Sequence, residues 1–272
     1  MLDLCCAIRS VFQYRDYRPQ PLTFGRVLRW LCQFNRRDRK HIRRLLKSVV
    51  YLSEKTVRDI VIEQNLALMA RLTAAGLQHH QMIYVSVHEA GSSSSLMLNM
   101  LRDQARLEQR GCVLLDAKDV RGIADTTNDL GEGAIIYIDD FIGSGKQLGD
   151  ERDFMIPFAV GTFSEFVLVP SICEEGRDAL AGRGIEIFAG HVHLKAARPL
   201  HKDTTGFDPV GKKRLRRICT AIDSHVPLGF RNMAVMVILY RNAPDNIPVL
   251  FRGSAGQTPY IGIFPRTTDM PV

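Results

Sequence analysis

The stretch Gly133-Ala-Ile-Ile-Tyr-Ile-Asp-Asp-Phe-Ile-Gly-Ser-Gly-Lys-Gln147 decides the fold class of this chain. Its apolar run, Ile135 to Ile138, has the length and composition of a strand that is buried on both faces. Two adjacent carboxylates, Asp139 and Asp140, follow this strand directly, and a short loop with two glycines comes next. In α/β proteins such loops bind anions through backbone N–H groups, while the acids face hydroxyl groups or a metal ion. The stretch therefore predicts a sugar-phosphate site.

Strands and helices alternate on both sides of this stretch, from about residue 81 onward. Besides the strand at 134–139, the sequence predicts strands at 82–87, 112–115, 166–169, 185–188 and 234–240. It predicts helices from the serines after residue 91 to about 110, at 174–182 and at 212–222, and a loop at 159–164. This alternation indicates an α/β fold with a doubly wound, mainly parallel sheet. Residues 81–272 are accordingly assigned to one α/β domain.

The first 80 residues are predicted to form a separate, helical and basic region. Thr23 has the position of an N-cap for a helix that continues to about Cys32. A second helix is expected at 36–50, and a third begins after Ser53 and ends at Gly76. Residues 1–20 have mixed composition, with Pro19 near their end and Pro21 directly after them, which favours a loosely attached arm.

Composition restricts the class of protein further. A chain of 272 residues with 46% hydrophobic content can bury a large core. No apolar run has the length of a membrane span, the N-terminus does not resemble a secretory signal, and six cysteines show no metal-ligand spacing. These features predict a reduced, cytoplasmic protein without a membrane partner. His191 and His193 alternate along one strand without a spaced third ligand, so no metal site built from protein side chains is expected.

The net charge of +7 is concentrated near the N-terminus. Residues 1–80 contain 15 Lys and Arg against 6 Asp and Glu, whereas residues 81–272 contain 21 against 23. One face of the helix expected at 36–50 carries seven cations: Arg36, Arg37, Arg39, Lys40, Arg43, Arg44 and Lys47. Close like charges on a helix repel by roughly a few tenths of a kcal/mol for each pair. The region is therefore predicted to meet a polyanion, nucleic acid first, with a solvated basic face as the alternative.

The loop at 143–147 has features of two kinds of phosphate loop. The P-loop of NTPases needs a glycine at the position of Asp140 and a Ser or Thr at the position of Gln147, and an acid inside a triphosphate site would repel the ligand. By contrast, residues 135–145 resemble the PRPP-binding signature of type I phosphoribosyltransferases, in which apolar residues precede two acids and a short Ser/Thr-Gly loop. The chain departs from that signature at Lys146 and Gln147, where the family usually has a small residue and a hydroxyl residue.

The resemblance assigns roles to these residues. It implies that Asp139 and Asp140 hold the ribose 2′- and 3′-hydroxyls, and that Gly143, Ser144, Gly145, Lys146 and Gln147 wrap the 5′-phosphate. A second loop, His88-Glu-Ala-Gly-Ser-Ser-Ser-Ser95, follows a predicted strand and opens a helix. It lies where phosphoribosyltransferases hold pyrophosphate, which assigns this role to Gly91, Ser92, Ser93, Ser94 and Ser95. A serine-rich N-cap without a ligand is the alternative for this loop. Mg²⁺ is expected to arrive with the phosphates of PRPP or of a nucleotide.

Further segments narrow the resemblance to one family. Residues 30–34, 45–53, 229–233, 242–246 and 264–266 are similar to segments of PRTase-CE, a phosphoribosyltransferase-like family of bacterial conflict and anti-phage systems, including some retrons. This resemblance implies an effector that acts on an N-glycosidic bond at ribose C1. It also implies possible partners: a retron DNA–RNA hybrid on the basic N-terminal helices, and a reverse transcriptase or another product of the same operon. It would let Asn242, Asp245 and Asn246 read a base.

Two other functions remain open at the level of sequence. The departures at Lys146 and Gln147 are compatible with a catalytically inactive module that senses a nucleotide on the same fold. A nucleic-acid-binding adaptor is the other alternative. It predicts salt-sensitive binding that is lost when Arg39, Arg43 and Lys47 are reversed in charge.

Overall fold

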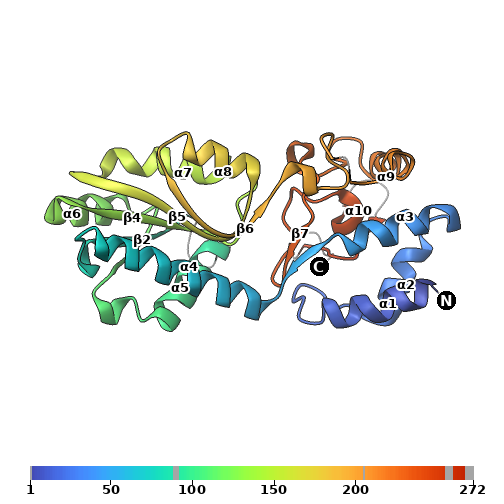
Figure 1. Ribbon diagram of the computed structural model, residues 1–272, viewed down its shortest axis with the longest axis horizontal. Coiled ribbons are helices and arrows are strands. Elements are labelled where there is room, and N and C mark those ends of the chain that lie inside the picture. The colour runs from blue at the N-terminus through green and yellow to red at the C-terminus, as the bar shows by residue number, and fades with distance from the viewer. Residues whose placement is uncertain (1, 88–91, 205, 255–259, 267–272) are drawn as a thin grey trace. The chain divides into compact units, whose positions relative to one another are not determined.

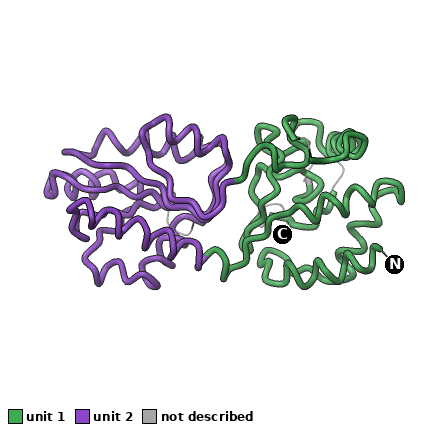
Figure 2. The backbone as a smooth tube through the Cα atoms, viewed as in Figure 1, with its two compact units in different colours: residues 1–57, 193–272 green, residues 58–192 purple. Residues whose placement is uncertain are grey.

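A computed structural model describes residues 2–87, 92–204, 206–254 and 260–266 of the chain (Figure 1). Two compact units are present (Figure 2): residues 1–57 with 193–272, called here the terminal unit, and residues 58–192, called the sheet unit. This division differs from the predicted boundary at residue 80, which followed the change from helical to strand-like sequence. The N-terminal helices fold together with the C-terminal segment, so the sheet unit is inserted between the two halves of the terminal unit.

The sheet unit contains five strands in the order β3-β2-β4-β5-β6. Their bounds are β2 Met82–Ser86, β3 Val113–Asp116, β4 Glu132–Ile138, β5 Thr162–Cys173 and β6 Glu186–His193. The pairs β2–β3, β2–β4 and β4–β5 are parallel, which confirms the predicted mainly parallel sheet. In a parallel sheet the carboxyl ends of neighbouring strands share one edge, so the segments that follow β2, β3 and β4 leave the sheet side by side.

Helices cover both faces of this sheet, as the predicted doubly wound fold requires (Figure 1). They are α4 Glu54–Ala74, α5 Ser93–Ala105, α6 Val120–Leu130, α7 Lys146–Met155 and α8 Glu174–Ala181. On one face, Ile135 and Tyr137 of β4 pack in a core that includes Ile123 of α6, Leu148 of α7 and Leu180 of α8. Tyr84 of β2 points to the other face, where its hydroxyl donates to Oδ1 of the buried Asn65 of α4 at 2.7 Å.

The terminal unit is mainly helical, with two small sheets. Its helices are α1 Leu2–Gln13, α2 Phe24–Cys32, α3 Arg36–Lys47, α9 Pro209–Ile222 and α10 Val249–Arg252. β1 Val50–Leu52 pairs in parallel with β7 Val237–Leu239, and β8 Gly253–Ser254 pairs in antiparallel fashion with β9 Tyr260–Ile261. Short 3₁₀ turns in the two units cover His79–Gln81, Glu108–Arg110, Ile156–Phe158, Lys195–Ala197 and Phe230–Asn232.

The N-terminal segment is part of this core, so the prediction of a loose arm at residues 1–20 is wrong. Tyr14 and Tyr17 are buried, and both rings make edge contacts with Phe264. The Tyr17 hydroxyl donates to the Pro265 carbonyl at 2.7 Å. Trp30 of α2 donates through Nε1 to the Leu250 carbonyl at 3.1 Å. These contacts join the two ends of the chain, which explains why they belong to one unit.

The predicted helix N-caps were confirmed, because a cap depends only on residues close to it in sequence. Thr23 caps α2, because its side chain accepts from the Arg26 N–H at 3.3 Å. The same holds for Ser53, whose hydroxyl accepts from the Thr56 N–H at 3.1 Å before α4. Two predictions fail: β1 was assigned to a helical region, and β5 begins at Thr162, inside the expected loop. Among the described helices, none combines the length and apolar character that crossing a membrane requires.

Candidate functional site

Asp139 and Asp140 follow β4 at the edge that the parallel strands share. Asp139 is 6% exposed, its N–H donates to the Leu168 carbonyl at 3.4 Å, and its Oδ1 accepts from the Asp140 N–H at 2.8 Å. Burial and the nearby Asp140 carboxylate raise the pKa of Asp139 well above its ordinary value. A carboxyl group with a raised pKa retains its proton to higher pH than an ordinary Asp, and this proton can be donated to a ligand oxygen. Ionising both carboxyl groups therefore costs free energy that hydroxyl donors or a cation would recover.

The loop after the two acids is fixed against β5. The Ile142 N–H donates to the Ser171 carbonyl at 3.1 Å, and the Ile142 carbonyl accepts from the Cys173 N–H at 2.8 Å. These bonds extend the parallel pairing of β4 and β5 past Asp140. Among the described residues, no backbone acceptor is found for the N–H groups of Gly143, Ser144 and Gly145. These groups are therefore available to bind an anion.

Two glycines let this loop lie directly on α8. Gly145 has a φ of 74°, in the left-handed region that favours glycine. Gly176 of α8 faces it: a Cβ added there would lie 2.6 Å from the Gly143 carbonyl oxygen and 3.2 Å from the Gly145 nitrogen. The loop conformation thus depends on the absence of a side chain at residue 176, a contact that the sequence did not reveal.

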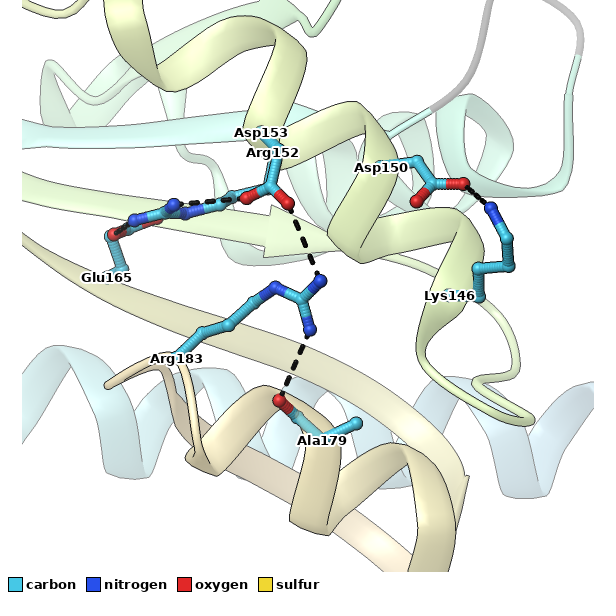
Figure 3. A network of polar contacts seen from close by, with 7 residues as sticks. All are labelled: Lys146, Asp150, Arg152, Asp153, Glu165, Ala179 and Arg183. Carbon is cyan, nitrogen blue, oxygen red and sulfur yellow. Dashed lines mark hydrogen bonds and ion pairs between the residues drawn. The ribbon is translucent and has the colours of Figure 1, made fainter.

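The predicted site residues Lys146 and Gln147 begin α7 and are exposed. The Lys146 N–H donates to the Ser144 hydroxyl at 3.4 Å, and its Nζ forms an ion pair with Asp150 one turn further on (Figure 3). The charge of Lys146 is therefore partly neutralised within the helix. Asp139, Asp140 and residues 143–147 thus lie along one continuous segment, from the end of β4 to the first turn of α7.

A polar network holds α7 on the sheet (Figure 3). Arg152 of α7 binds Glu165 of β5 through two hydrogen bonds, Nε to Oε2 at 2.9 Å and Nη2 to Oε1 at 2.5 Å. The hydroxyl of Tyr137 in β4 donates to the same carboxylate at 2.7 Å. Arg183 after α8 reaches Asp153 at 3.4 Å. Because Arg152 and Glu165 are mostly buried, this bidentate pair positions the helix that follows the glycine loop.

Arg152→Gln is expected to lower the free energy of unfolding by about 2–3 kcal/mol, because Glu165 then keeps a mostly buried charge without its bidentate partner. Urea unfolding followed by circular dichroism measures the loss. Arg177→Gln is the matched control: Arg177 pairs with its neighbour Asp178 on an exposed part of α8, and its loss should cost about 0.5 kcal/mol or less. Equal midpoints for the two variants would contradict a structural role for the Arg152–Glu165 pair.

The second predicted loop is described only from Ser92 onward. Ser86, the last residue of β2, is paired with Ile138, the last residue of β4. The chain therefore leaves β2 beside the point where Asp139 follows β4. Gly91 lies outside the described residues, as do His88 and Glu89. Ser92 caps α5, with its hydroxyl 3.3 Å from the Ser95 N–H and 3.1 Å from the Ser94 hydroxyl. Ser93 opens the helix beside it. The helix cap that was the alternative for this loop is thus present, and a ligand role for Ser92–Ser95 stays a prediction.

Sequence reasoning missed one carboxylate at the same edge. Asp116 ends β3, and its Oδ2 accepts from the Ser86 hydroxyl at 3.2 Å. Its Oδ1 accepts from the Lys118 N–H at 2.9 Å, so both carboxylate oxygens have partners. An acid directly after a predicted strand is the signal that identified Asp139, and it could have identified Asp116 as well.

The predicted base-reading segment belongs to the terminal unit. Asn246 is buried, and its Nδ2 lies 3.0 Å from the sulfur of Met233. The Asn242 side chain accepts from the next residue's N–H at 3.0 Å, and the Asp245 carbonyl accepts from the Phe230 N–H at 2.9 Å. The turn is therefore bonded to residues 230–235, and a base-reading role for Asn242, Asp245 and Asn246 stays a prediction.

The residues around the loop fit a magnesium ion that is carried by phosphate groups. Within the described ranges, no group of three or more His, Cys, Asp or Glu side chains could hold a metal ion. Mg²⁺ in nucleotide sites is usually bound by substrate phosphates, waters and one or two carboxylates. Asp140, half-buried beside Asp139, is the carboxylate nearest the loop in sequence and could supply such an oxygen.

A family model described as PRTase-CE matches residues 27–266, a range that includes most of both halves of the terminal unit and the whole sheet unit. The matched range includes the acids after β4, the loop and α7. No curated protein matches the chain.

Proposed function

Because the chain belongs to the PRTase-CE family, we propose that it binds PRPP or a nucleotide and acts on the N-glycosidic bond at ribose C1. Membership gives a phosphoribosyltransferase-like function at the coarse level. The observation that supports the finer proposal is the pair Asp139–Asp140 beside a glycine loop that β5 and α8 hold in place. Acids and free N–H groups at one sheet edge are what a ribose phosphate requires.

Each part of the loop has a role in this proposal. Asp139 and Asp140 bind the two ribose hydroxyls, and the N–H groups of residues 143–147 bind the 5′-phosphate. The segment Gly91–Ser95, at the start of α5, binds the pyrophosphate or another leaving group. Reactions at ribose C1 pass through an oxocarbenium-like transition state, so the bound anion and the acids must stabilise positive charge at C1. Mg²⁺, when bound, neutralises phosphate charge and thereby helps the leaving group depart.

The biological setting is part of the proposal and derives from the resemblance to PRTase-CE. The chain would be a cytoplasmic effector of a retron-type anti-phage system, with an activity that is toxic to the cell when released. A reverse transcriptase or another product of the same operon would restrain it.

Isothermal titration calorimetry with PRPP, with and without Mg²⁺, tests the small-molecule proposal. We expect saturable binding of the full-length protein that weakens when Mg²⁺ is removed. Ribose 5-phosphate should bind more weakly than PRPP, because it lacks the pyrophosphate that the second loop would hold. Absence of heat with PRPP, ribose 5-phosphate and nucleoside monophosphates alike would refute a ribose-phosphate site.

A turnover assay separates catalysis from sensing. Incubation with nucleotides, or with PRPP and free bases, followed by chromatography should reveal release or capture of a base if the site is catalytic. Binding without turnover favours the sensor, for which the Lys146–Asp150 ion pair and Gln147 in place of a hydroxyl residue are the supporting observations.

A further inference from the structure

The two compact units carry charges of opposite sign. The terminal unit, residues 1–57 and 193–272, contains 25 Lys and Arg against 9 Asp and Glu, a net charge of +16. The sheet unit, residues 58–192, contains 11 against 20, a net charge of −9. The overall net charge of +7 therefore hides one strongly basic unit. About half of the Lys and Arg residues of that unit lie in residues 193–272. Such a concentration of one sign marks a surface for a polyanion.

Two helices that are far apart in sequence come together in this unit. α9 packs against α3, and Arg214 of α9 forms an ion pair with Asp38 of α3 at 3.1 Å. Close packing at this contact depends on Gly211, because a Cβ there would lie 2.4 Å from Nδ1 of His41. The guanidinium of Arg44 lies over the ring of Phe207, 4.8 Å from its centroid, just before α9 begins. α3 and α9 thus form one continuous surface.

The structure separates the cations of α3 into two groups. Arg39 and Arg43 are mostly buried and bind the carboxylate of Asp3, and their guanidinium groups lower the pKa of Asp3. Their role is to hold α1 on α3, so they are a poor choice for testing nucleic-acid binding. The remaining five are Arg36, Arg37, Lys40, Arg44 and Lys47. At about 100° per residue they occupy an arc of about 100° on the helix.

α9 adds a second row of cations, Lys213, Arg216 and Arg217. We call these three residues and the five of α3 the two-helix basic surface. Within the described ranges of the chain, none of the eight forms an ion pair with an acid. Burial and the nearby Arg216 lower the pKa of Lys212 on the same helix, as expected where cations are crowded. Bringing these charges together costs free energy that a bound polyanion would recover.

We propose that the two-helix basic surface binds the phosphate backbone of a nucleic-acid duplex. Proteins that grip single strands combine cations with exposed aromatic rings on which bases stack. Neither α3 nor α9 contains a Phe, Tyr or Trp, and Phe207 beside Arg44 is buried, so these helices offer charge without an exposed ring for stacking. The axes of packed helices lie about 8–10 Å apart, so the cations of α3 and α9 are close enough to contact several phosphates of one duplex. This binding is independent of the reaction at the Asp139 loop.

Fluorescence anisotropy with a labelled DNA duplex of about 20 base pairs tests the proposal, at several salt concentrations. The full-length protein should bind with an affinity that falls steeply with salt. The α3 pair Arg37→Gln/Lys40→Gln and the α9 pair Lys213→Gln/Arg217→Gln should each weaken binding by roughly tenfold at low salt. Each pair should also lower the slope of log K against log salt by about 2, one for each lost phosphate contact.

Arg9→Gln/Arg15→Gln is the matched control, because it removes two exposed positive charges from the same unit that belong to neither α3 nor α9. It should bind the duplex nearly as the wild type does. The proposal is overturned if the control loses as much affinity as the two pairs, or if the α9 pair binds normally. It is also overturned if vesicles with anionic lipids, or a single strand of equal length, bind more tightly than the duplex. Urea unfolding of each variant distinguishes lost binding from lost folding.

Discussion

Asp139→Asn is expected to weaken PRPP binding by roughly 100-fold while it stabilises the ligand-free protein. In the complex, ribose hydroxyls would donate to the carboxylates, and an amide cannot replace that negative charge. Hydrogen bonds to charged groups contribute about 1.5–3 kcal/mol each, which accounts for a loss of this size. Without ligand, Asn has nearly the shape of the carboxyl group but no charge to bury, so stability should rise by about 0.5–2 kcal/mol at neutral pH.

The pH dependence of stability provides an independent readout of the same residue. Burial and Asp140 raise the pKa of Asp139, so between the unfolded and folded pKa values the native state binds more protons than the unfolded state. The free energy of unfolding must then fall as pH rises through this window. Asp139→Asn should remove that decline. Urea unfolding from pH 4 to 8 measures the effect, and Asp129→Asn, at an exposed position of α6, is the control. Unchanged PRPP affinity in Asp139→Asn would contradict the ribose role.

Gly176→Val is expected to reduce PRPP affinity by roughly 10- to 100-fold, although residue 176 lies on α8 and outside the loop. A Cβ at this position would lie 2.6 Å from the Gly143 carbonyl oxygen and 2.8 Å from Cγ2 of Ile142, so the loop must move. A displacement of about 1 Å would misalign the N–H groups with the phosphate. Overpacking should also cost about 1–3 kcal/mol of stability.

A control on the same helix separates the two effects of this substitution. Gly182→Ala places a Cβ at the C-terminal end of α8, where its nearest contacts are carbonyl oxygens of that helix at 3.3 and 3.6 Å. It should leave PRPP affinity unchanged. Calorimetry and urea unfolding of both variants are the measurements. If Gly176→Val loses stability but binds PRPP as the wild type does, the loop does not hold the phosphate.

The sequence predicted best what is determined locally. The apolar run before Asp139 and the glycines after Asp140 were sufficient to place a strand, its end and a turn, and Thr23 was sufficient to place a cap. It failed where distant segments decide the structure. Tyr14 and Tyr17 resemble residues of a mixed polar arm until Phe264 and Pro265 come into contact with them. β1 has only three residues, and its pairing partner β7 lies almost 190 positions further along the chain.

For the same reason, counting charges in the sequence does not show which cations are available to bind a partner. Arg39, Lys40, Arg43 and Arg44 are all cations of one helix, so the sequence does not distinguish their roles. The position of Asp3 in the structure shows that Arg39 and Arg43 form ion pairs with an acid. Likewise, Gly176 is an ordinary helix residue by sequence, and its importance follows from the loop that lies against it.

The insertion of the sheet unit within the terminal unit has a consequence for synthesis on the ribosome. Residues 58–192 are contiguous and can fold as soon as they emerge. By contrast, Tyr14, Tyr17 and Trp30 must wait for their partners Leu250, Phe264 and Pro265. At about 5–20 residues per second, that delay lasts on the order of 10 seconds or more. The two-helix basic surface is incomplete until α9 has been translated, so a nascent chain would complete its β4 loop before it could grip a duplex.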